Sequence, residues 1–220
     1  MNDDLIAKLT ARTADLHLPA ALDDFTVKKI CAATEDKFII FTCTNAEHCA
    51  LTAYFHTETH EFKVRQRIGL TEFCLTKFFT EDFARFKELI DAELDNVLKN
   101  LRDVRRGKLN RFLREKKIDA WTYGNELPAT LEGFELFIKP AAPVEVTNGS
   151  FIVINYADFS LNSDFAISYN VYADEFSGET KISGAPNVTY AFDAATLEGL
   201  EDKLKANLVN ELREIRRLSK

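Results

Sequence analysis

Three histidines are the residues of this 220-residue chain whose types and spacing come closest to a chemical site. His48, His56 and His60 follow one another closely, with two cysteines and several glutamates nearby. On an extended strand His48 and His56 would share one face, because side chains alternate with a period of two. Imidazoles that converge with a carboxylate are typical ligands of zinc and other transition metals, so this hairpin is a candidate metal site. The alternative is an exposed hairpin whose polar face carries histidine and threonine.

Signatures of the common catalytic and nucleotide-binding sites are absent from the sequence. The eight glycines are too dispersed to form a phosphate-binding loop, and no GxSxG, HExxH or kinase motif occurs. All four histidines lie in the first half of the chain, so a histidine-dependent site would belong there. The sequence therefore gives no catalytic residue and no reason to expect a cofactor, and it favours a non-catalytic protein.

Trp121 and Tyr123, in the segment DAWTYGNELP, are a second pair of interest. Aromatic rings that also carry a polar atom often line ligand grooves. Large aromatic residues more often pack against a sheet or a neighbouring unit. We therefore weigh a groove against a packing role for this pair, and the sequence favours packing.

Charge is distributed unevenly along the chain, whose formal net charge is −7. Residues 102–117 contain eight basic and two acidic side chains, a net of +6, whereas residues 118–202 contain two basic and 14 acidic ones, a net of −12. The basic run would suit a nucleic acid, but the overall charge and the lack of a reader motif count against that partner. The acidic span favours a basic protein segment as partner. Its alternative role is a solubilising surface.

The sequence predicts a cytoplasmic protein that does not enter a membrane. No apolar run approaches the roughly 20 residues that a spanning helix needs. The amino-terminal segment MNDDLIAKL is acidic and lacks the layout of a secretion signal. The four cysteines form no CxxC pair, which is typical of free thiols in a reducing compartment.

Three phrases of the sequence occur twice, in the same order. LPAALDDF (residues 18–25) is similar to LPATLEGF (127–134), KFIIF (37–41) to SFIVI (150–154), and LRDVRR (101–106) to LREIRR (212–217). The spacings are 109, 113 and 111 residues, so only short insertions separate the copies. We interpret the chain as a tandem duplication, with repeats at residues 1–107 and 108–220.

The elements that must position these residues are the same in both repeats. A short helix comes first, at Leu5, Ile6 and Leu9 in one repeat and at Leu109, Phe112 and Leu113 in the other. Four to five antiparallel strands follow, rich in β-branched and aromatic residues, and a long amphipathic helix ends each repeat. We expect Thr80 and Asp193 to cap the long helices. The predicted fold class is α+β with a pseudo-two-fold relation between the repeats.

These observations favour a cytosolic binding or adaptor protein without catalytic activity. It would engage a basic protein segment through a groove or through the acidic face of the second repeat. The alternative is a small-ligand or metal-binding protein, or an enzyme, with a site between the repeats or at the His48, His56 and His60 hairpin. An internal pseudo-dimer is compatible with a monomeric chain.

Overall fold

The protein consists of two compact units, Met1–Asp103 and Val104–Lys220. Each unit combines helices with one antiparallel sheet, so the predicted α+β class is confirmed. The predicted repeat boundary after residue 107 lies outside the described part of the chain. The computed structural model describes residues 1–106, 111–147 and 149–219.

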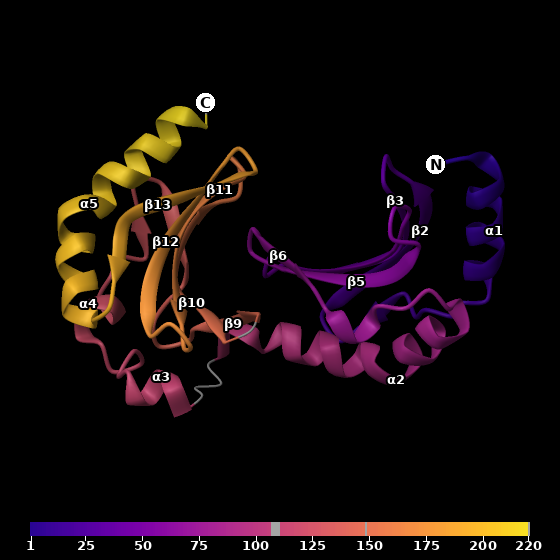
Figure 1. The fold of residues 1–220 in the computed structure, drawn as a ribbon, viewed down its shortest axis with the longest axis horizontal. Coiled ribbons are helices and arrows are strands. Elements are labelled where there is room, and N and C mark those ends of the chain that lie inside the picture. Colours follow the sequence, from indigo (N-terminus) through magenta and orange to yellow (C-terminus); the bar gives the residue numbers. More distant parts are fainter. Residues whose placement is uncertain (107–110, 148, 220) are drawn as a thin grey trace. The chain divides into compact units, whose positions relative to one another are not determined.

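The first unit is a six-stranded antiparallel meander whose strands pair in chain order. Its elements are α1 (Asp3–Ala14), β1 (Ala21–Leu22), β2 (Phe25–Ala33), β3 (Lys37–Thr44), β4 (Cys49–His56), β5 (Glu61–Ile68), β6 (Thr71–Cys74), the short 3₁₀ helix η1 (Thr76–Phe78) and α2 (Phe83–Arg102). Helix α1 packs beside β2 and β3, and α2 packs against β4 and β5 (Figure 1).

The apolar stripe of α2 explains why this segment is helical and which side of it is buried. Apolar residues recur every three or four positions, and the stripe from Phe86 to Leu101 is buried. The helix begins after Asp82, whose carboxylate accepts the Ala84 N–H at 2.8 Å. The predicted cap at Thr80 is wrong, because the Thr80 backbone pairs with Phe62 at the edge of β5. The N-cap is the residue directly before the first helical one, and Thr80 lies three residues before Phe83.

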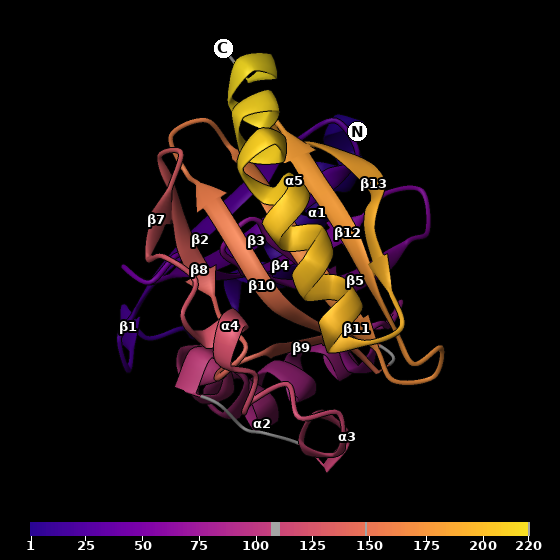
Figure 2. The same cartoon turned by 90° about the vertical axis from the view of Figure 1, so that its left-hand side faces the viewer.

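The second unit is a seven-stranded antiparallel sheet covered by one long helix. Its elements are η2 (Val104–Arg106), α3 (Arg111–Glu115), α4 (Thr122–Asn125), β7 (Thr130–Leu131), β8 (Phe134–Ile138), β9 (Val144–Thr147), β10 (Ser150–Asp158), β11 (Ser163–Asn170), β12 (Glu175–Ile182), β13 (Ala185–Ala194) and α5 (Leu197–Leu218). The order across the sheet is β13-β12-β11-β10-β8-β7, and β9 also pairs with β10. Helix α5 lies across the face of β11, β12 and β13 (Figure 2).

The core of the second unit lies between α5 and this sheet. Strand β11 contributes Phe165, Ile167 and Tyr169, which alternate along the strand as the sequence pattern predicts. Phe192 packs edge-on against Phe165, with ring centroids 4.7 Å apart. The residues of α5 that are buried there are Leu200, Leu204, Leu208, Leu212 and Ile215.

Helix α5 is capped by Thr196, whose hydroxyl accepts the Gly199 N–H at 3.1 Å. The predicted cap at Asp193 is wrong, because that residue is still part of β13. In the short helix of this unit, Leu113 is buried and Phe112 is 54% exposed. Leu109, the third residue predicted there, lies outside the described residues.

The prediction of four to five strands in each unit is wrong, because the sheets have six and seven. Two additional strands, β1 and β7, lie within the repeated LPA phrase and are only two residues long. A third, β9, lies in the segment that precedes SFIVI. The segment EFCLTKFF (residues 72–79) also has the aromatic and β-branched composition of a strand, but it is extended only as far as Cys74, because η1 then turns the fully buried Phe78 into the core.

We expect Phe78→Ala and Phe192→Ala each to lower the free energy of unfolding by about 3–5 kcal/mol, because each removes a fully buried ring. Phe112→Ala is the matched control, and we expect it to change the free energy by less than about 0.5 kcal/mol. Urea denaturation followed by circular dichroism measures all three values. A loss below about 1 kcal/mol at Phe78 or Phe192 would contradict the packing of that ring in the core.

Candidate functional site

The three histidines of the predicted metal site are not brought together. His48 directly precedes β4 and His56 ends it, so the two imidazoles lie at opposite ends of the strand. Eight positions of extended chain span about 26 Å, which no single metal ion can bridge. Only His56 and His60 lie at the same end of the hairpin. Within residues 1–106, 111–147 and 149–219, no group of three or more His, Cys, Asp or Glu side chains could hold a metal ion.

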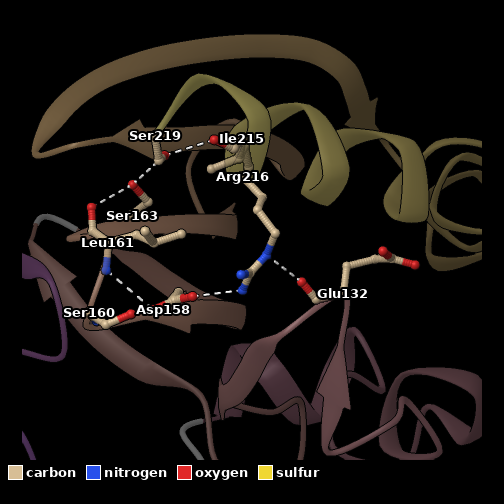
Figure 3. A network of polar contacts seen from close by, with 8 residues as sticks. All are labelled: Glu132, Asp158, Ser160, Leu161, Ser163, Ile215, Arg216 and Ser219. Carbon is tan, nitrogen blue, oxygen red and sulfur yellow. Dashed lines mark hydrogen bonds and ion pairs between the residues drawn. The ribbon is translucent and has the colours of Figure 1, made fainter.

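An extended polar network lies at the end of α5 (Figure 3). Arg216 donates from Nε to the Glu132 carbonyl oxygen and from Nη2 to the Asp158 carboxylate, both at 2.7 Å. Its guanidinium also lies over the Phe134 ring, 5.3 Å from the centroid. At Gly133, whose φ is +82°, a Cβ atom would collide with this guanidinium, so the β7–β8 turn requires glycine there.

The carboxylate that Arg216 binds is held in its charged form. Burial would raise the pKa of Asp158, but hydrogen bonds from Ser160 and Leu161 and the Arg216 charge outweigh that effect. The pKa of Asp158 therefore lies below its ordinary value. Since Asp158 ends β10 and Glu132 lies in the β7–β8 turn, Arg216 fastens the last turn of α5 to two separate parts of the sheet.

The hydrogen-bond partners that the serine of this network has among residues 1–106, 111–147 and 149–219 include no base. Ser163 is fully buried, and its hydroxyl lies 2.7 Å from the Ser219 hydroxyl and 3.0 Å from the Leu161 carbonyl oxygen (Figure 3). It also accepts the Ser183 N–H at 2.8 Å. A nucleophilic serine needs an adjacent base, and these partners are backbone groups and another hydroxyl. The contacts of this network connect the end of α5 to β10, β11 and the β7–β8 turn.

A groove of about 500 Å³ lies between the segment that precedes the second sheet and the first turns of α5. We call it the Trp121 groove. It combines aromatic rings, carboxylates and one ammonium group. Its lining residues are Lys117, Ala120, Trp121, Thr122, Tyr123, Glu126, Leu197, Glu198 and Glu201.

Trp121 belongs both to the groove and to the core of the second unit. Its side chain is only 7% exposed, and its indole N–H donates to Oε2 of Glu201 at 3.0 Å. Gly124 is required one turn later, because a Cβ atom there would overlap the indole ring. Tyr123 lies beside it, with ring centroids 5.9 Å apart. The two roles weighed from the sequence, packing and groove wall, are therefore combined in one side chain.

The electrostatics of the groove favour cations. Oε1 of Glu201 lies 2.6 Å from the Lys205 ammonium, and hydrogen bonds from Lys205 and then Trp121 lower the pKa of Glu201. The Lys205 ammonium also lies over the Tyr123 ring, 5.1 Å from its centroid. The carboxylates of Glu126 and Glu198 have no hydrogen-bond or ion-pair partner in the described part of the chain.

No recognisable sequence motif contains the four charged residues described above, Glu126, Glu198, Glu201 and Lys205. The available signal is that Glu198, Glu201 and Lys205 follow one another at helical spacing on the polar side of α5. Their relation to Trp121 depends on how α5 packs, which their spacing does not indicate.

A smaller cavity of about 360 Å³ lies in the first unit, beside the LPA phrase. The ammonium of Lys29, in its wall, donates to the backbone carbonyls of Ala14 and Leu16 at 3.0 and 3.4 Å. This cation is therefore already satisfied by the protein. The Trp121 groove, with its unpaired carboxylates, is the better candidate for binding a ligand.

Comparisons with models of protein families, with curated proteins and with solved structures find no match to this chain. Across the described residues, no helix has the length and the apolar character needed to cross a membrane. Function is therefore inferred from the geometry of the molecule.

Asp164 gives the second unit a pH dependence. This side chain is 5% exposed, and burial raises the pKa of its carboxyl group to about 6. The charge of Lys181 and a hydrogen bond from Asn155 lower the pKa by smaller amounts, and the charge of Glu179 raises it further. The folded state therefore holds this proton more tightly than the unfolded chain, whose aspartates have a pKa near 3.9. Its contribution to stability is present at low pH and is lost as the pH rises from about 4 through 6.

We expect Asp164→Asn to remove most of this pH dependence, because the amide stays neutral. The variant should gain about 2–3 kcal/mol relative to the native chain between pH 4 and pH 7. Urea denaturation at both pH values measures the difference. A constant difference between variant and native chain across this range would contradict the raised pKa.

Proposed function

We propose that the chain is a non-catalytic binding protein that engages a basic segment of another protein at the Trp121 groove. The observation that carries the proposal is the pair of carboxylates of Glu126 and Glu198, which have no partner among the described residues, beside the aromatic wall of Trp121 and Tyr123. Carboxylates that lack an internal partner can pair with a ligand cation without first losing an interaction of their own.

Charge and ring chemistry both support a cationic partner. The groove contains three glutamates and one lysine, and it lies within the acidic span 118–202 and its margin. Ammonium and guanidinium groups also bind to the faces of aromatic rings. A nucleic acid is a poorer candidate, since the carboxylates would repel its phosphates. The cytoplasmic location stays a prediction from the sequence.

We also propose that the two units arose by duplication, as the repeated phrases suggest. Strands β3 and β10 each contain one bulge against the following strand, at Ile40 and at Val153. These two fully buried residues are 113 positions apart, which is the spacing of KFIIF and SFIVI. Bulges are specific features of a fold, so a shared position supports common descent.

The pairing registers support the same proposal. The pair Ala50 and Arg67 in β4–β5 corresponds to Asp164 and Lys181 in β11–β12, each 114 positions later. Ile68 pairs with Thr71 as Ile182 pairs with Ala185, again 114 positions later. The additional strand of the second sheet agrees with the duplication. Strand β9 pairs with β10 as the second half of β2 pairs with β3, and three inserted residues separate β9 from β8.

The long helices follow the same spacing of 114 residues. Each buried leucine or isoleucine of α5 has a buried apolar counterpart in α2, for example Leu200 with Phe86 and Ile215 with Leu101. The phrases LRDVRR and LREIRR match at a spacing of 111 residues, which differs by three from the spacing at which the two helices correspond. The first phrase leaves its helix after Arg102, whereas the second is helical throughout.

The groove residues differ between the two units at these corresponding positions. At a spacing of 114, Glu198 corresponds to Ala84 and Glu201 to Lys87. At the 109 spacing of the LPA phrase, Tyr123 corresponds to Ala14 and Glu126 to His17. The acidic and aromatic character of the groove is therefore confined to the second unit, and we assign the proposed binding to that unit alone.

Fluorescence anisotropy with labelled peptides tests the proposal. A lysine-rich peptide of about twelve residues should bind more tightly than its glutamate counterpart, and more weakly as salt screens the charges. The double variant Glu126→Gln/Glu198→Gln should weaken binding by about tenfold, roughly 1.4 kcal/mol. The double variant Glu135→Gln/Glu145→Gln is the matched control, because it removes the same charge from exposed positions of the acidic span.

Equal binding of both peptides would contradict the proposal. Equal weakening by the two double variants would show that overall acidity, and not the groove, attracts the peptide.

A further inference from the structure

We propose that the Tyr123 ring and the Glu201 carboxylate form a subsite for the ammonium group of a ligand lysine, and that Lys205 occupies this subsite in the free protein. The inference rests on the proposed function and adds the chemical class of the side chain that is recognised. It also predicts a competitor that belongs to the chain itself.

The geometry of Lys205 carries the inference. Its ammonium lies 2.6 Å from Oε1 of Glu201 and 5.1 Å from the centroid of the Tyr123 ring. Tyr123 and Glu201 both line the Trp121 groove, whereas Lys205 does not. An ammonium group supplied from within the chain therefore already occupies a position that a ligand ammonium could reach from the groove. A carboxylate beside an aromatic face is the combination that binds such cations.

Lys205 is placed so that it can leave. Its side chain is 54% exposed, and it pairs with a glutamate four positions earlier on the same helix. Exposed pairs of this kind contribute little to stability, because both side chains lose freedom when they pair and water screens the charges. A ligand can displace Lys205, but its apparent affinity is reduced by the fraction of molecules in which Lys205 occupies the subsite.

The hydrogen bond from Trp121 indicates which cation the subsite prefers. The indole N–H binds Oε2 of Glu201, so only Oε1 faces a cation at hydrogen-bond distance. Arginine binds carboxylates best through two parallel hydrogen bonds to both oxygens, and here the second one would have to share Oε2 with the indole N–H. Lysine is a compact charge that one oxygen can satisfy. We therefore expect lysine to be preferred to arginine.

The test uses the whole chain, and Trp121 is its only tryptophan. Binding at Glu201 should change the fluorescence of the indole, so titration with a lysine-rich peptide reports on the subsite directly. Lys205→Met should bind this peptide about three- to tenfold more tightly than the native chain, because the internal competitor is gone. An arginine-rich peptide of equal length should bind the native chain more weakly than the lysine-rich one.

Lys203→Met is the matched control. It removes the same charge from the same helix, but the Lys203 ammonium binds the Asp193 carbonyl oxygen and does not contact Tyr123 or Glu201. We expect it to change affinity by less than about twofold, the effect of long-range charge alone.

Equal effects of Lys205→Met and Lys203→Met would overturn the subsite but leave the binding of basic segments intact. Tighter binding of the arginine-rich peptide would overturn the assignment to lysine. If neither peptide binds the native chain or Lys205→Met, the subsite and the proposed function both fail.

Discussion

The packing of α5 on one face of the second sheet determines where the Trp121 groove and the Arg216 contacts lie. Five buried side chains spaced along the helix, from Leu200 to Ile215, fix its rotation and its position on the strands. A helix fixed in this way presents its polar side in a defined direction. At its first turns, Glu198 and Glu201 therefore lie beside Trp121. At its last turn, Arg216 reaches the β7–β8 turn and the end of β10.

Trp121 connects this core to the groove. A buried ring that donates a hydrogen bond to Glu201 holds one carboxylate oxygen at a fixed place. The same ring belongs to the buried core cluster that contains Leu113 and Ile118, so core packing holds this wall of the groove in place. A preorganised wall of this kind limits the entropy that the protein loses when it binds a ligand, which favours recognition by few contacts.

Much of the fold follows from periodicity in the sequence. Large apolar residues at alternate positions, Phe165, Ile167 and Tyr169, predict β11, and the apolar stripes predict α2 and α5. The residues at which helices start are harder to predict from the sequence. Thr80 and Asp193 have side chains that suit a helix cap, but their backbones belong to the sheets. Short strands such as β7 depend on tertiary pairing and have no pattern of their own.

The candidate site also consists of one part that the local sequence indicates and another that depends on tertiary packing. Trp121 and Tyr123 are conspicuous in the sequence, but the carboxylates opposite them come from a helix about 80 positions later. The histidine hairpin shows the reverse, because His48 is close to His56 and His60 in sequence and distant from them in space. His48 and His56 share a face by parity, yet the length of β4 separates them. The alternation of side chains along a strand tells which face of the sheet a residue occupies, and not how far apart two residues lie.

The central claim is that a lysine ammonium binds next to Trp121, and one NMR experiment tests it most directly. The chain contains one tryptophan, so an ¹⁵N-labelled sample gives a single indole N–H signal. On titration with a lysine-rich peptide, this signal should shift progressively and saturate together with the backbone amides of Glu198 and Glu201. Saturable binding with an unchanged indole signal, and shifts confined to other surfaces, would contradict the claim.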